Sequence, residues 1–319
     1  MARALRIEYP GAVYHLMSRG DRREPIFGDD TDRVRFVETL GEACAKTDWQ
    51  VHAYCLMGNH FHLVIETPNG NLVTGMRWFL STYTARFNRR HKLFGHLFSG
   101  RYKSLLVDGS SDNYLPTVCD YVHLNPSRAR LLQPKQPLRD YGWSSWPLYL
   151  QPPAQRPTWL RVDRLLGEHH IARDTPHGRR KLEEHLEERR ACEDGGSYKA
   201  IRRGWCLGDD AFRQDLLHQS HGLAGENHHA NIRRETTEDK ARRILKEELD
   251  QLGWTKKDLG RCAKGDPRKV KIAQRLRAET SVTLKWIAQH LQMGVWTHVS
   301  NQLRNPPSSP KQKELNLCQ

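Results

Sequence analysis

The chain lacks any apolar run long enough to cross a membrane. A spanning helix needs roughly 20 predominantly apolar residues, and none of the 319 residues begins such a run. The first 20 residues, MARALRIEYPGAVYHLMSRG, contain neither the apolar segment nor the cleavage site of a secretory signal peptide. We therefore expect a protein that is neither inserted into a membrane nor secreted.

Paired cysteines are absent as well. The seven cysteines are scattered singly along the chain, at Cys44, Cys55, Cys119, Cys192, Cys206, Cys262 and Cys318. An odd number of isolated cysteines, with no Cys-x-x-Cys pair, predicts neither a disulfide framework nor a zinc ribbon. A reducing cytoplasm is the expected location, where a DNA-binding protein would associate with the nucleoid.

Acidic residues are too few to balance the basic ones. Lys and Arg number 51 against 37 Asp and Glu, which gives a net charge of +14 and a pI near 9.6. Such a balance favours a polyanionic partner, because neutralising phosphates releases condensed counterions. Nucleic acid is favoured over an anionic membrane, and a solvated basic surface without a partner is the alternative.

Short β-like and helical segments alternate through the first 135 residues. Apolar spacing predicts strands and helices, and a tight hairpin is expected at Gly58-Asn59. The strands are expected over 11–20, 49–57, 60–68 and 101–108, and the helices over 30–46, about 71–90 and 111–132. The order βαββαβα predicts an α+β fold, in which helices pack on a small antiparallel sheet.

Five prolines between residues 137 and 157 mark a change of texture. Clustered prolines with exposed-looking aromatics are typical of a domain end followed by a linker. We therefore predict a first domain over residues 1–150, a proline-rich linker and helical region over 151–239, and a helical C-terminal domain over 240–305.

The C-terminal domain contains the spacing of a helix-turn-helix. Apolar residues recur at i, i+3, i+4 and i+7 from Leu284 to Leu291, Gly294 marks a break, and a second short helix follows. The second helix of such a motif can enter the major groove. Its outward candidates for DNA binding are Trp296, Thr297, His298, Ser300 and Asn301. An ordinary helical hairpin is the alternative, and the basic flank KGDPRKVKIAQRLR favours DNA.

Two histidines share one face of a predicted strand in LMGNHFHLVIETP, residues 56–68. Side chains alternate along a strand, so His60 and His62 project to one face and Phe61 to the other. Two imidazoles at i and i+2 can hold a divalent ion through ring nitrogens. A His-x-His alone is weak evidence, because isolated strand histidines are usually surface or core residues.

A phenol and an amide follow in DNYLPTVCDYVHLNPSRARLL. Tyr121 and Asn125 are four residues apart, which places them on one face of a helix. Asn125 could offer its amide oxygen to a metal, or it could cap a helix that has Pro126 at its first position. Tyr121 could present its phenol to a phosphate, or it could be a half-buried aromatic anchor. Tyr114, seven residues earlier, is a rival nucleophile.

Four stretches together resemble one protein family. GNHFHLVIETP, LFSGRYKSLLVD and YVHLNPSRARLL, with VYHLMSRGDRREPIF near the start, are similar to the REP-associated tyrosine transposases. These belong to the single-tyrosine HUH superfamily, where HUH denotes His-hydrophobic-His. The resemblance covers roughly residues 1–150, and the tail resembles more loosely the helix-turn-helix extensions of longer members.

The resemblance implies a ferredoxin-like βαββαβ fold with the histidine pair on a central strand. It implies cleavage of single-stranded DNA through a 5′-phosphotyrosine, with Mg²⁺ or Mn²⁺ and without ATP, on hairpins of repetitive extragenic palindromes. Carried onto this sequence, His60 and His62 become metal ligands, Tyr121 the nucleophile and Asn125 the third ligand. Members act as monomers or as dimers with shared active sites, and either state is possible here.

Basic residues near these motifs are candidates for DNA contact. Arg101 and Lys103 alternate on one strand face and could clamp phosphates, and Arg19, Arg22 and Arg23 in SRGDRR could contact a hairpin or its flanking bases. A plain solvated surface is the alternative for each of them.

Three functions remain open at this point. The chain could be a DNA nickase and strand transferase, a catalytically silent DNA-binding regulator, or a metal phosphodiesterase that uses water and leaves Tyr121 idle. Only the first would form a covalent adduct between protein and DNA.

Overall fold

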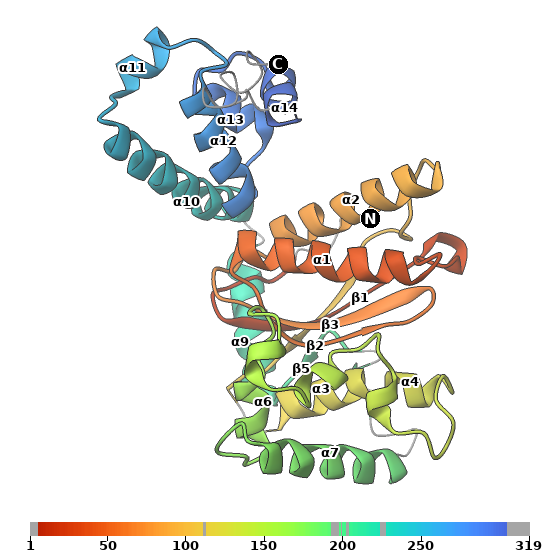
Figure 1. Ribbon diagram of the computed structural model, residues 1–319. Coiled ribbons are helices and arrows are strands. Elements are labelled where there is room, and N and C mark those ends of the chain that lie inside the picture. The colour runs from red at the N-terminus through yellow and green to blue at the C-terminus, as the bar shows by residue number, and fades with distance from the viewer. Residues whose placement is uncertain are drawn as a thin grey trace. The chain divides into compact units, whose positions relative to one another are not determined.

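The computed structural model in Figure 1 describes residues 6–110, 113–192, 198, 200–201, 204–223 and 228–304. The chain divides into two compact units, Met1–Glu226 and Asn227–Gln319. Among the described helices, none has both the length and the apolar character needed to span a bilayer.

The first unit is built on a βαββαβ core. Its elements in chain order are β1 (Ala12–Arg19), α1 (Asp30–Thr47), β2 (Gln50–Leu56), β3 (His60–Thr67), α2 (Leu72–His91) and β4 (Lys103–Val107). The sheet order β2-β3-β1-β4 is antiparallel throughout, because β3 pairs with β2 and β1, and β1 also pairs with β4. This is the ferredoxin-like topology, so the predicted α+β fold is confirmed.

Helices α1 and α2 cover one face of the sheet (Figure 1). Asp29 caps α1 by accepting a hydrogen bond from the backbone N–H of Asp32 at 3.1 Å. Phe36 of α1 lies with its ring centroid 4.9 Å from those of Phe61 in β3 and Phe79 in α2. Each such fully buried ring contributes roughly 1.5–3 kcal/mol. This aromatic core fixes the side of β3 that faces away from the two histidines.

The other face is covered by α3 (Tyr114–His123) and α4 (Asn125–Arg128). Leu115, Val118 and Val122 of α3 are fully buried, which seats this helix on the sheet. A helix was expected over 111–132. Residues 111–112 lie outside the described residues, and two helices meet at Leu124 where one was expected.

Residues after 137 continue to pack on this unit, although a linker was expected from residue 151. Backbone hydrogen bonds join Leu56 to Trp143 at 2.8 Å and Val51 to Trp159 at 2.9 Å, so the chain runs along the outer edge of β2. The elements that follow are α5 (Trp146–Tyr149), α6 (Asp163–Glu168), α7 (Pro176–Ala191), β5 (Cys206–Leu207) and α9 (Asp210–Leu223). Strand β5 pairs in parallel with β4 and completes a five-stranded sheet. The first compact unit extends to Glu226 and includes buried residues beyond residue 150, such as Leu160, Leu165 and Tyr198.

The second unit is helical. It contains α10 (His228–Leu252), α11 (Lys256–Arg261), α12 (Pro267–Glu279), α13 (Leu284–His290) and α14 (Trp296–Arg304). Ile287, Leu291 and Val299 are fully buried, as the apolar spacing predicts. The turn between α13 and α14 contains Gly294 at φ +84°, a backbone conformation that suits glycine.

Candidate active site on the second face of the sheet

The pairing of β1 with β3 defines the face on which the two histidines lie. His60 is opposite Arg19 and His62 is opposite Met17 across the ladder. Residues directly opposite in an antiparallel pair share a face, so Arg19 lies beside His60. Phe61 points the other way, into the aromatic core. His60 and His62 therefore share one face, the arrangement that a joint metal site requires.

A third histidine, which the sequence reasoning missed, contacts this pair. His15 Nε2 lies 2.9 Å from His62 Nδ1, and the two rings are stacked with centroids 5.1 Å apart. Burial lowers the pKa of His15 to about 3 and lowers that of His62 well below its usual value. Both rings are therefore neutral at pH 7, and one N–H is shared between them. Alternation along β1 places His15 on this face, but only the strand pairing shows it beside His62.

His60 is held from its backbone side. Its Nδ1 lies 2.8 Å from Asn59 Oδ1, and Asn59 Nδ2 in turn donates to the carbonyl oxygen of Arg23 at 3.0 Å. Because an amide oxygen only accepts, Nδ1 carries the proton and Nε2 keeps a lone pair. Burial, with a smaller contribution from Arg19, lowers the pKa of His60 to about 4. The ring is thus neutral and presents a basic nitrogen to the face.

Helix α3 brings Tyr121 to the histidines. The centroid of its ring lies 5.8 Å from that of His62 and 5.6 Å from that of His15, edge-on in both cases. The side chain is 8 % exposed. Tyr114 begins the same helix, seven residues earlier, which is roughly 10 Å along the axis. Of the two candidate nucleophiles, Tyr121 is the one that the structure places at the histidine pair.

Two further residues cover the Tyr121 ring. The guanidinium carbon of Arg128 lies 4.1 Å above it, and the ring of Tyr198 lies 5.2 Å from it. Arg128 also contributes to lowering the pKa of His62, which places its charge near that ring. Neither residue was identified from the sequence. Arg128 stands seven positions after Tyr121 in NPSRAR, two helical turns later, and this spacing was the available signal.

Asn125 stands next to this group without capping a helix. Leu124 is the N-cap of α4, and Asn125 is the first helical residue with no capping hydrogen bond. Its Oδ1 accepts from Arg128 Nη2 at 3.0 Å, whereas Nδ2 is buried without a partner among the described residues. The capping role that the Asn-Pro sequence suggested is therefore wrong. A carbonyl oxygen has two lone pairs, so one remains for another partner.

The predicted basic residues lie around the same end of the sheet. Arg22 and Arg23 form a short 3-10 turn with φ of 50° and 65°, and this loop is joined to the β2–β3 turn through the Gly20 N–H, which donates to the Asn59 carbonyl oxygen at 2.8 Å. Lys103 is exposed and lies opposite Met17, which itself lies opposite His62. Arg101 is exposed in the bend before β4.

The outward residues predicted on the last helix belong to the second unit. Trp296 is 55 % exposed, and Thr297 and Asn301 are also exposed on α14. His298 and Ser300 are partly buried. The structure thus leaves three of the five side chains open to a partner.

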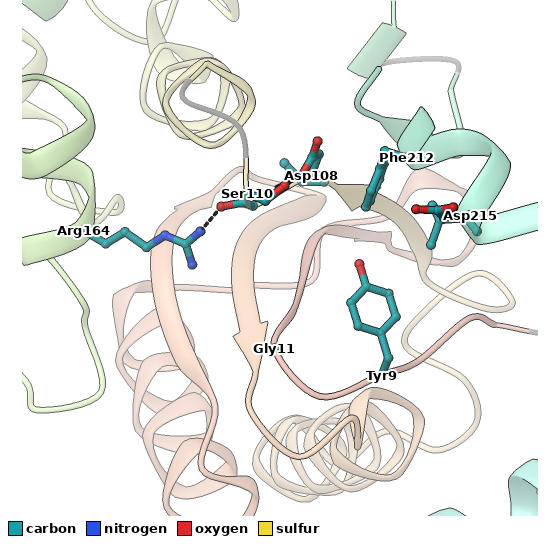
Figure 2. Close-up of a pocket in the computed structure, with 10 residues that line it drawn as sticks. Tyr9, Gly11, Asp108, Ser110, Arg164, Phe212 and Asp215 are labelled. Atoms are coloured by element: carbon teal, nitrogen blue, oxygen red, sulfur yellow. Dashed lines mark hydrogen bonds between the residues drawn. The ribbon is translucent and has the colours of Figure 1, made fainter. Parts of the chain in front are cut away.

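A cavity elsewhere in the first unit is separate from this site. Figure 2 shows Tyr9, Asp108, Arg164 and Phe212 around a cavity of about 390 Å³ at the start of β1. Gly11, in its wall, is six residues from Met17, which is roughly 20 Å along an extended strand. Arg164 forms an ion pair with Glu66, with Nη1 2.7 Å from Oε2, and its Nη2 donates to the Gly109 carbonyl oxygen. The cavity is therefore not the place where Tyr121 meets the histidines.

A second group of possible metal ligands lies behind α3. Asp120, His169 and His185 have ligand atoms that all lie within 4.8 Å of one another. None of the three was singled out from the sequence, because they are far apart along the chain and form no spaced motif.

A solved structure of the REP-associated tyrosine transposase bound to a REP hairpin aligns with 51 % of this chain and 90 % of its own, at 13 % identity and a TM-score of 0.39. No curated protein matches the chain. The family model described as "Transposase IS200 like" matches residues 9–125, a segment that contains His60, His62, Tyr121 and Asn125. Over residues 9–125 this protein is therefore similar to the IS200-like transposases.

Proposed function

We propose that this protein is a metal-dependent single-stranded DNA endonuclease and strand transferase that cuts through a 5′-phosphotyrosine on Tyr121. One observation carries the proposal: the Tyr121 ring meets His62 and His15 edge-on, within 5.8 Å of each, on the face that His60 shares. A mere aromatic anchor would need no imidazoles, whereas a phosphoryl-transfer site needs a nucleophile beside groups that manage phosphate charge.

The three proposed ligands fit a divalent ion. His60 and His62 are neutral, as metal-binding imidazoles must be, and Asn125 has a free lone pair on Oδ1. Mg²⁺ or Mn²⁺ bound there would polarise a non-bridging oxygen of the scissile phosphate and orient the diester for in-line attack. The same proposal makes His15 the residue that orients His62: with the Nδ1–H of His62 donating to Nε2 of His15, Nε2 of His62 keeps a lone pair for the metal.

The chain's own residues supply the nucleophile and a positive charge that can stabilise the scissile phosphate. A phenol has a pKa near 10 and attacks poorly at neutral pH without help. The guanidinium of Arg128, 4.1 Å above the ring, can contact the phosphate as the bond forms. The Tyr121 oxygen bonds to phosphorus, the bond to the 3′ oxygen breaks, and the leaving oxygen takes up a proton. The freed 3′-hydroxyl can reverse this step and join strands.

DNA binding is proposed for the basic residues around the site and for α14. Arg22 and Arg23 both have positive φ, which is costly for non-glycine residues and is retained mainly where function requires it. Their loop is tied to the turn before His60, so a strand entering the site would pass Arg19 and this loop. The substrate proposed is hairpin-forming repeat DNA, and α14 would contact the flanking duplex.

The experiment uses single-stranded DNA that carries the palindromes flanking the encoding gene. We expect incubation with Mg²⁺ or Mn²⁺ to give a protein–DNA adduct that survives denaturing electrophoresis. Tyr121→Phe keeps the ring and should bind DNA without forming an adduct, whereas the matched control Tyr114→Phe should still form one. Mass spectrometry of the trapped peptide identifies the residue that carries the nucleotide.

The results also separate the other two functions. Binding without cleavage in any metal would indicate a silent regulator. Cleavage without an adduct, unchanged in Tyr121→Phe, would indicate a phosphodiesterase that uses water. A nucleotide on Tyr114 would refute the assignment of the nucleophile.

A further inference from the structure

Asp120, His169 and His185 come together from three helical elements of the first unit. Asp120 lies on α3, His169 is the C-cap of α6, and His185 lies on α7, which runs alongside α3 (Figure 1). Asp120 is 2 % exposed, and the rings of the two histidines have centroids 4.8 Å apart. All three offer atoms that metals bind, and these atoms lie within 4.8 Å of one another.

One buried nitrogen in this cluster has no hydrogen-bond partner. The side chain of His169 is only 9 % exposed, and its Nε2 makes no hydrogen bond with any described residue. The nearest carboxylate oxygen, Asp120 Oδ1, lies 3.7 Å away, which is too far for a hydrogen bond. An unpaired buried polar group is destabilising, so native structures seldom retain one without a reason.

The carboxylate is arranged so that one oxygen is left for the histidines. Arg189 Nη1 holds Asp120 Oδ2 at 2.7 Å, while Oδ1 faces His169. This is the usual environment of a ligating carboxylate, in which a neighbouring group holds one oxygen and the metal binds the other. Arg189 lies one helical turn after His185 on α7, so the same helix supplies a ligand and the group that orients another.

From this geometry we infer that Asp120, His169 and His185 form a zinc site, distinct from the one at His60 and His62. Two imidazoles and one carboxylate, with a water molecule in fourth place, make up a donor set that suits Zn²⁺. Ligand atoms around a tetrahedral zinc lie about 3.3 Å apart, given bonds of ~2.0–2.1 Å. His185 is the exposed member, and a rotation of its side chain would shorten the distances between the ligand atoms, which now extend to 4.8 Å, toward that value.

The site would serve the helix that carries the nucleophile. Successive residues on a helix point about 100° apart, so Asp120 turns away from the histidine pair that Tyr121 meets. A zinc ion there would join α3 to α6 and α7. Its role would be to hold α3 in place, and it would take no part in the cleavage chemistry.

The test measures zinc bound per protein by the full chain, with Zn²⁺ alone as the probe. His185→Ala should lose one equivalent of bound zinc, or weaken its binding at least tenfold, while remaining folded because the side chain is exposed. His177→Ala is the matched control, since His177 is an exposed histidine on the same helix. It should bind zinc as the wild type does.

Two further measurements make the result decisive. His169→Gln should lose the same equivalent as His185→Ala, and zinc should raise the unfolding temperature of wild type and of His177→Ala but not of His185→Ala. His60→Ala should retain this equivalent, which separates the two sites. Equal zinc binding by His185→Ala and His177→Ala, or no tight zinc in the wild type, would overturn the inference.

Discussion

Replacing His15 by Phe tests whether this histidine orients the proposed metal ligand His62. The change keeps an aromatic ring beside His62 and Tyr121 but removes the nitrogen that lies 2.9 Å from His62 Nδ1. Without that contact, His62 can place its proton on either nitrogen, and the tautomer with a lone pair on Nε2 is no longer favoured.

The magnitude follows from the role of such partners. Loss of a group that orients a metal-binding histidine typically weakens metal affinity 10–100-fold, which is about 1.4–2.7 kcal/mol. We therefore expect the Mn²⁺ concentration for half-maximal adduct formation to rise by that factor. The adduct yield at saturating Mn²⁺ should stay close to that of wild type, since Tyr121 and Arg128 are unchanged.

The assay is adduct formation on single-stranded hairpin DNA over a series of Mn²⁺ concentrations. His52→Phe is the matched control, because His52 is also fully buried but contacts Glu66, at 3.1 Å, rather than His62. That variant should lose stability without a change in the Mn²⁺ midpoint. The reasoning fails if folded His15→Phe has the wild-type midpoint, or if the two variants shift it equally.

Three further predictions concern the metal, the extent of the first unit and pH. EDTA should abolish cleavage, Mn²⁺ should restore it, and full activity in EDTA would refute a metal role. His60→Ala should lose cleavage, while its affinity for hairpin DNA, measured by gel shift, stays within a few-fold of the wild-type affinity. A fragment of residues 1–226 should retain adduct formation, but it should bind flanking duplex more weakly than the full chain and with a smaller salt dependence. A fragment of residues 1–150 should be insoluble or inactive. An active fragment of residues 1–150 would show that residues 151–226 are dispensable. Burial lowers the pKa of His52, so the unfolded chain takes up a proton near pH 6.5 when the folded protein does not. The contribution of His52 to the free energy of unfolding should therefore be greatest above pH 6.5. It should fall by about 1.4 kcal/mol per pH unit below that value until the pKa of His52 in the folded protein is reached. The urea midpoints at pH 7.5 and pH 5.5 should differ less for His52→Gln than for wild type.

The order of strands and helices along the first 108 residues could be predicted, because the spacing of apolar residues indicates each element locally. Alternation in 60–68 and the Gly58-Asn59 turn fix the β2–β3 hairpin, and the helical spacing in 30–46 separates it from β1. These signals need only neighbouring residues. The shared face of His60 and His62 follows from the same alternation, and so does the helix that carries Tyr121.

Contacts between distant segments could not be predicted in this way. His15 and His62 are 47 positions apart, and no window of sequence contains both. Residues from 151 on were interpreted as a linker and helical region because clustered prolines and exposed-looking aromatics are typical of a domain end. Leu160, Leu165 and Tyr198 of that region are buried in the first unit, and whether such a residue is buried depends on a surface that the rest of the chain must first provide.

The late segments that pair with the sheet also have a consequence for synthesis. The Val51 N–H donates to the carbonyl oxygen of Trp159, and the Leu106 N–H donates to that of Trp205. Both acceptors are synthesised long after their donors. At 5–20 residues per second a ribosome delivers each partner on the order of ten seconds after the strand that it bonds. During that time β2 and β4 each keep one edge without a partner, and such edges are prone to pair with other chains. Tyr198, which covers the proposed nucleophile, is also made late, so a nascent chain would complete the proposed cleavage site only when most of the first unit has left the ribosome.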